Sequence, residues 1–108
     1  MSYPIRRGGI AAFLSICAYA QVANQTALVG IVTDATGKAV VTSAVSALNT
    51  GTGDVYNTTT SETGVYSIQS IRTGVYDITV KEPGFRTFRA TRVQVDTNQV
   101  VRTDVIMM

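Results

Sequence analysis

The sequence is poor in the residues that most often carry catalysis. Its 108 residues include no histidine and one cysteine, Cys17. Histidine is the usual general base and a frequent zinc ligand, and cysteine is another common nucleophile and metal ligand. No serine is flanked by the glycines of a nucleophile elbow. We therefore expect a protein that is not an enzyme, with no catalytic residue and no cofactor.

Carboxylates leave one alternative, a calcium site. Asp34 and Glu62 lie in predicted turns and Asp77 in a predicted strand, and the three could in principle approach one another. Calcium takes about six or more oxygen ligands, whereas turn carboxylates more commonly cap the turn or face solvent. The pattern therefore favours the absence of a metal site.

The N-terminal apolar run is too short to span a membrane and has the setting of a secretory signal peptide. Arg6 and Arg7 precede the run 9–18, and Ala18-Tyr19-Ala20 places small residues where signal peptidase reads them. Spanning a bilayer takes about 20 apolar residues. We expect residues 1–20 to be removed, so that residues 21–27 form an exposed lead-in and the chain is exported.

Cys17 admits a second interpretation, as the lipid-bearing residue of a lipoprotein. Such sites usually have glycine or alanine just before the cysteine, whereas here the preceding residue is Ile16. The cleavage site after Ala20 fits better, and lipidation stays open as the alternative. Cleavage would leave no cysteine, and hence no disulfide and no thiolate metal site.

The charge of the mature chain gives no sign of a nucleic-acid partner. Removal of Arg6 and Arg7 leaves seven basic and seven acidic residues. Nucleic-acid binding needs a clustered positive surface. Arg86, Arg89 and Arg92 are spaced by three, which on an extended chain alternates between faces. We therefore interpret them as solvated charges.

A repeated phrase at the centre of the chain predicts two successive strands. Gly-Val-Tyr-x-Ile begins at Gly64 and again at Gly74. In the second copy Tyr76, Ile78 and Val80 share one face, because side chains in a strand alternate with a period of two. One apolar and one polar face, with turns every 8–12 residues or so, is typical of an antiparallel sandwich or barrel.

The rest of the chain extends this pattern to seven or eight short strands without an amphipathic helix. Gly30 in the first strand predicts a bulge or a close backbone approach, and Asp34 begins a turn that closes at Gly37. The threonine-rich stretch 54–60 is expected at a sheet edge. The class is all-β, in one domain spanning residues 28–108.

Several spaced motifs resemble the carboxypeptidase regulatory-like domain over residues 28–107. The motifs are Gly30-x-Val32-x-Asp34-x-x-Gly37, Thr60-x-x-x-Gly64-x-Tyr66-Ser67, Gly74-x-Tyr76-x-Ile78-x-Val80 and Pro83-Gly84-Phe85. The resemblance implies a seven-stranded antiparallel β-sandwich of the transthyretin-like (prealbumin-like), Greek-key type. Tyr66, Tyr76 and Phe85 are expected to fill its core.

The resemblance also implies an accessory, non-catalytic role. An exported bacterial copy is similar to the N-terminal extension of TonB-dependent outer-membrane receptors of the Oar-like kind. The expected location is the periplasm or outer membrane. The expected partner is an envelope protein, or the plug and barrel of the same receptor. The chain is then either a fragment of such a receptor or a free-standing module.

Carbohydrate binding is the alternative function. The related starch-binding folds stack sugars on exposed aromatic rings. Once the three core rings are assigned, Tyr56 and Phe88 remain as candidate glycan or partner contacts.

Overall fold

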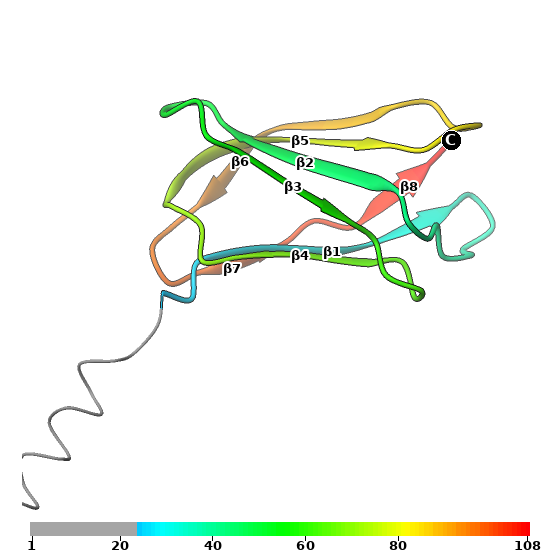
Figure 1. Ribbon diagram of the computed structural model, residues 1–108, viewed down its shortest axis with the longest axis horizontal. Helices are drawn as coiled ribbons and strands as arrows, with labels where there is room; N and C mark the ends of the chain where they lie inside the picture. The colour runs from blue at the N-terminus through cyan, green and yellow to red at the C-terminus, as the bar shows by residue number, and fades with distance from the viewer. Residues whose placement is uncertain (1–23) are drawn as a thin grey trace, which may run out of the picture.

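The computed structural model describes residues 24–108, which form a two-layered β-sandwich (Figure 1). The eight strands are β1 (Ala27–Asp34), β2 (Ala44–Asn49), β3 (Val55–Thr59), β4 (Val65–Gln69), β5 (Gly74–Lys81), β6 (Phe88–Val95), β7 (Val100–Arg102) and β8 (Val105–Met107). Within residues 24–108 there is no helix that could cross a membrane. The predicted signal peptide, residues 1–20, lies outside the described residues.

Each layer is a four-stranded sheet. One sheet has the order β4-β1-β7, with β8 also pairing with β1, and the other has the order β3-β2-β5-β6. The threonine-rich strand β3 lies at the edge of its sheet, as predicted. The prediction of an all-β sandwich is confirmed.

Two details of the predicted sandwich are corrected. The alternation predicts one last strand over residues 100–108, but this stretch is divided into β7 and β8, so the strands number eight instead of seven. In addition, β1 pairs in parallel with both β7 and β8, so that sheet is mixed and not antiparallel throughout. The chain reaches β7 from β6 of the other sheet, and a crossing between layers does not impose the antiparallel direction that a hairpin does.

The break between β7 and β8 lies against Gly30. The backbone N–H of Thr103 donates to the Val29 carbonyl at 2.8 Å, while the Ile31 N–H donates to the Asp104 carboxylate at 3.0 Å. A Cβ on Gly30 would collide with the Thr103 carbonyl and the Tyr66 ring. The close backbone approach predicted from Gly30 is therefore confirmed.

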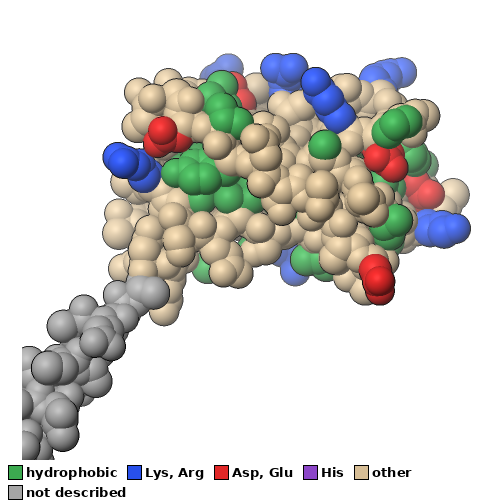
Figure 2. Space-filling model, viewed as in Figure 1, with side chains coloured by type: hydrophobic (Ala, Val, Ile, Leu, Met, Phe, Trp, Pro, Cys, Tyr) green, Lys and Arg blue, Asp and Glu red, His purple; other side chains and the backbone are tan. Residues whose placement is uncertain are grey.

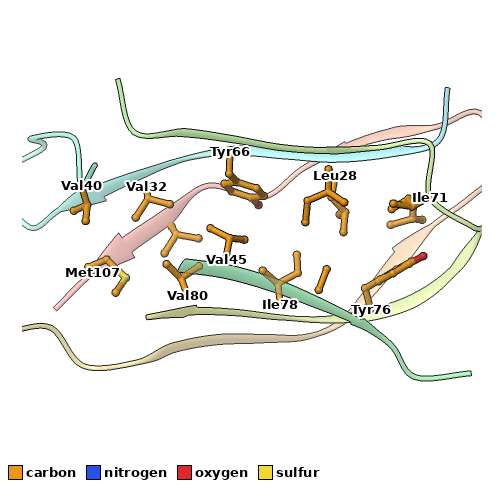
Figure 3. Close-up of a cluster of buried hydrophobic side chains, with 14 residues drawn as sticks. Leu28, Val32, Val40, Val45, Tyr66, Ile71, Tyr76, Ile78, Val80 and Met107 are labelled. Atoms are coloured by element: carbon orange, nitrogen blue, oxygen red, sulfur yellow. The ribbon is translucent and has the colours of Figure 1, made fainter. Parts of the chain in front are cut away.

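The core lies between the sheets and is built from alternate residues of the strands (Figure 3). Tyr66 and Tyr76 are fully buried, and so are Ile78 and Val80 on the same face of β5 as Tyr76. Burial of each such aliphatic side chain contributes about 1.5–3 kcal/mol. Phe85 packs against this cluster and is partly exposed.

The turn after β1 is organised by Asp34. Its Oδ1 accepts hydrogen bonds from the Thr36 N–H at 2.9 Å, the Thr36 hydroxyl at 2.6 Å and the Lys38 N–H at 3.0 Å. Gly37 has a φ of 88°, which glycine adopts without a steric penalty. These hydrogen bonds lower the pKa of Asp34, the one from the Thr36 hydroxyl most strongly.

Candidate functional site

The two rings singled out from the sequence face the interior side of their sheet. Tyr56 packs against Tyr76, with 6.2 Å between ring centroids and 50° between ring planes. Tyr56 and Phe88 are both partly buried against the core. Because β3 and β6 are the opposite edges of one sheet, the structure does not bring the two rings together. A glycan contact by either ring stays a prediction.

The opposite, outer face of that sheet contains a hollow of about 750 Å³ lined by residues of β2, β3, β5 and β6. The side chains that alternate outward at this hollow belong to Ala44, Ser46, Asn57, Thr59, Thr79, Lys81 and Arg89, and we call this set the polar trough. Lysine and arginine side chains gather along the side of the molecule that this sheet forms (Figure 2).

The strand register explains the form of the polar trough. Asn57 lies opposite Ser46, Ser46 opposite Thr79, and Thr79 opposite Arg89. One row of four polar side chains therefore crosses the whole sheet. In the next row Ala44 lies between Thr59 and Lys81. The short side chains of the central strand β2 leave a depression between longer neighbours.

The polar trough carries unpaired positive charge. Its lining includes Lys81 and Arg89 and no carboxylate. The ion pairs among residues 24–108 join Arg72 to Asp54 and Arg102 to Asp104. On β5 and β6 the Tyr76, Asp77 and Gln94 side chains form hydrogen bonds, whereas within the described part of the chain no side-chain hydrogen bond engages Thr79, Lys81 or Arg89. These groups are free to bind a ligand.

The outer face of the other sheet carries apolar side chains with polar ones among them. Val65, Val100 and Ile106 are 39%, 57% and 54% exposed and flank β1, opposite Ile31, Ala27 and Thr33 respectively. Val29 and Ile31 are half-buried on the same face of β1, and Val29 lies between Ser67 and Arg102. We call Val29, Ile31, Val65, Val100 and Ile106 the apolar face. A hollow of about 420 Å³ adjoins it at Asn24, Gln25 and Val100.

The buried tyrosines have structural roles. The Tyr66 hydroxyl donates to the Thr103 carbonyl at 2.6 Å, and the Tyr76 hydroxyl to the Arg72 carbonyl at 2.7 Å. Burial raises the pKa of Tyr66 to about 12, and the nearby Asp104 adds to the rise. Burial also raises the pKa of Tyr76. Both phenols therefore keep their protons at physiological pH.

The acidic residues considered for calcium do not form a site. Asp34 caps its turn, and Asp77 lies on β5, where its Oδ1 accepts from the Arg92 N–H at 3.4 Å. In the part of the chain that the structure describes, no three residues of His, Cys, Asp or Glu are grouped as they would be around a metal ion.

Sequence reasoning missed the polar trough. Alternation already places Ser46, Asn57 and Thr79 on the polar faces of their strands. It does not say which strands are neighbours, and the spacing of Arg89 from Arg86 and Arg92 predicts solvated charges instead of a shared face. In the folded chain β6 has a bulge opposite Asp77, because the register shifts between Tyr76 and Ile78.

Solved structures share this fold at low sequence identity. A candidate carbohydrate-binding protein from Bacteroides uniformis matches with a TM-score of 0.61 at 20% identity, over 75% of this chain and 40% of that one. The major pilin subunit of Bacillus cereus matches with a TM-score of 0.58 at 16% identity, over 77% of this chain and 28% of the pilin. A candidate carbohydrate-binding protein from Pseudomonas aeruginosa matches with a TM-score of 0.51 at 16% identity, over 82% of this chain and 93% of that one.

These likenesses concern the fold alone. This chain spans well under two thirds of the Bacteroides and Bacillus chains. No curated protein sequence matches it significantly. The family model of the carboxypeptidase regulatory-like domain matches residues 27–108, which contain every strand of both sheets. The chain therefore belongs to the carboxypeptidase regulatory-like domain family.

Proposed function

We propose that this protein is a non-catalytic accessory module of the bacterial cell envelope that docks against another domain through its apolar face. The observation that carries the proposal is the exposure of Val65, Val100 and Ile106 on one sheet. Exposed apolar side chains that gather on one face of a protein usually mark a contact site. Burying it would contribute about 25 cal/mol for each Å² removed from water.

The occupant proposed for the apolar face is the plug of a TonB-dependent outer-membrane receptor, with this module at its N-terminal side. The predicted signal peptide and the family membership support this placement. In addition, Ile106 belongs to β8, which runs to Met107. A domain following β8 in a longer receptor chain would therefore begin beside the apolar face.

The reading frame beyond codon 108 tests the receptor context. We expect it to encode a plug domain and then many alternating strands of about ten residues, as in a membrane barrel. A stop codon directly after codon 108 would contradict it. Photo-crosslinking from position 65 in the envelope then tests the contact, and crosslinks to the plug are the expected product.

A second candidate function is carbohydrate binding by the polar trough. The observation that favours it is the row Asn57, Ser46, Thr79 and Arg89 across four strands, because hydroxyl, amide and guanidinium groups are the partners that sugar hydroxyls take. The names of the Bacteroides and Pseudomonas proteins agree with this candidate. Calorimetry with a panel of oligosaccharides tests it. Heat of binding that persists in Tyr56→Ala would assign the binding to the polar trough instead of to the Tyr56 ring.

A further inference from the structure

We infer that the polar trough binds an acidic saccharide, a sugar chain bearing carboxylates, with its anionic groups held by Arg89 and Lys81. This inference rests on the second function proposed above and adds the charge of the ligand.

The polar groups are divided between the two sides of the trough. Asn57 and Ser46, on β3 and β2, offer an amide and a hydroxyl. Thr79 and Arg89, on β5 and β6, offer a hydroxyl and a guanidinium. One side thus offers neutral groups alone, and the other side adds a charge beside the Thr79 hydroxyl. A sugar ring with hydroxyl groups along one edge and a carboxylate on the other edge matches this division.

The two cations lie close to each other on the outer face. Arg89 is directly opposite Thr79, and Lys81 is two residues further along β5 on the same face. Diagonal neighbours of this kind have Cα atoms about 7–8 Å apart, within reach of long side chains. Both can approach one carboxylate, and the planar guanidinium can bind it with two parallel hydrogen bonds.

Among residues 24–108 no acidic residue forms an ion pair with Lys81 or Arg89. Asp77, two residues from Thr79 on the same face, does not line the hollow, and its carboxylate accepts from the Arg92 N–H at 3.4 Å. Glu82 follows Lys81 in the chain and does not line the hollow. The two cations therefore have no carboxylate partner among residues 24–108. An anionic ligand would provide one.

The dimensions fit a short oligosaccharide. Three inter-strand steps of about 4.8 Å separate Asn57 from Arg89, roughly 14 Å across the sheet. The hollow of about 750 Å³ is within the range of ligand sites, roughly 300–1,000 Å³. Ala44 and Ser46 keep its floor low, so a ring can lie across β2.

Calorimetry with one sugar chain in two charge states tests the inference. The probes are an oligogalacturonate with free carboxylates and the same oligomer fully methyl-esterified. We expect the free acid to bind at least tenfold more tightly, because each charge-assisted hydrogen bond is worth on the order of a tenfold change in Kd.

Arg89→Gln and Lys81→Gln should each weaken binding of the acid about tenfold and leave binding of the ester unaffected. Ala44→Leu should weaken both forms by filling the floor.

Lys38→Gln is the matched control, since Lys38 lies in the turn after β1 and its side chain lines neither hollow. Equal loss with this variant would overturn the inference in favour of diffuse attraction. Tighter binding of polyglutamate than of the uronate would overturn it as well. Equal binding of the acid and the ester would overturn the role of Arg89 and Lys81 and leave the proposed carbohydrate binding intact. If neither form bound, both the charge preference and the proposed carbohydrate binding would be rejected.

Discussion

The Tyr66 hydroxyl donates a hydrogen bond of 2.6 Å to the Thr103 carbonyl, directly over Gly30. This contact ties β4 to the interruption between β7 and β8, across the central strand β1. The ring of Tyr66 occupies the space that a side chain at position 30 would need. One phenol therefore fills the core and satisfies a carbonyl at the break.

Replacement of Gly30 by alanine should destabilise the protein severely. The added Cβ would meet the Thr103 carbonyl and the Tyr66 ring, and overpacking of this kind costs about 3 kcal/mol at the upper end. Urea denaturation provides the measurement. Gly51→Ala is the control, because only ordinary contact is made there, and its effect should stay within about 0.5 kcal/mol. Equal stability of the two variants would show that the backbone at position 30 can move aside.

Stability should fall between pH 10 and pH 12. Burial raises the pKa of Tyr66 from 10.0 to about 12, so the neutral phenol is favoured in the folded state. The neutral Tyr66 phenol contributes fully to the free energy of unfolding below pH 10. As the pH rises to 12, this free energy should fall by about 2–3 kcal/mol. Tyr76 adds to the fall, since its pKa is also raised. Free energies of unfolding measured at several pH values check this.

Tyr66→Phe serves as the control for that titration. Removing the hydroxyl leaves the Thr103 carbonyl without this donor, which costs about 1–3 kcal/mol at neutral pH. The fall above pH 10 should become shallower in the variant, leaving the part due to Tyr76. An unchanged slope would contradict the assignment to Tyr66.

Asp34→Ala should lower the Tm, because the turn after β1 loses the acceptor of three hydrogen bonds. Asp34→Asn should lower the Tm much less than Asp34→Ala does, since its amide oxygen can accept the same hydrogen bonds as Oδ1. The pKa of Asp34 is lowered from 3.8, so its contribution is present above that pH and is lost as the pH falls below it. Acid denaturation of the wild type and the Asn variant measures this, and parallel curves would argue against a role for the charge.

Lysine on the apolar face should abolish docking without unfolding the module. Val65→Lys and Ile106→Lys each place a charge at an exposed position. The free energy of unfolding should change by no more than about 0.5 kcal/mol. Docking should be lost, because burying an unpaired charge in the contact is costly. Val55→Lys, exposed on the other sheet, is the matched control. Co-purification with the plug domain measures the effect, and equal recovery of all three variants would reject the apolar face as the docking surface.

The amino-acid sequence by itself determined the strands and the inward side of most of them. Alternation around Tyr76 and the glycine before it is a local property, so the buried face of β5 could be predicted without a partner strand. The turn at Asp34 and the close approach of another backbone segment to Gly30 could also be predicted, because each depends on the chemistry of one residue and its backbone.

Only the tertiary structure decided which strands became neighbours. The parallel pairing of β1 with β7 and the row from Asn57 to Arg89 join residues far apart in the chain, and no local pattern encodes that choice. The direction of Tyr56 and Phe88 was settled in the same way. Their place against the core depends on the space left by side chains from other strands, and that space exists only after both sheets have packed together.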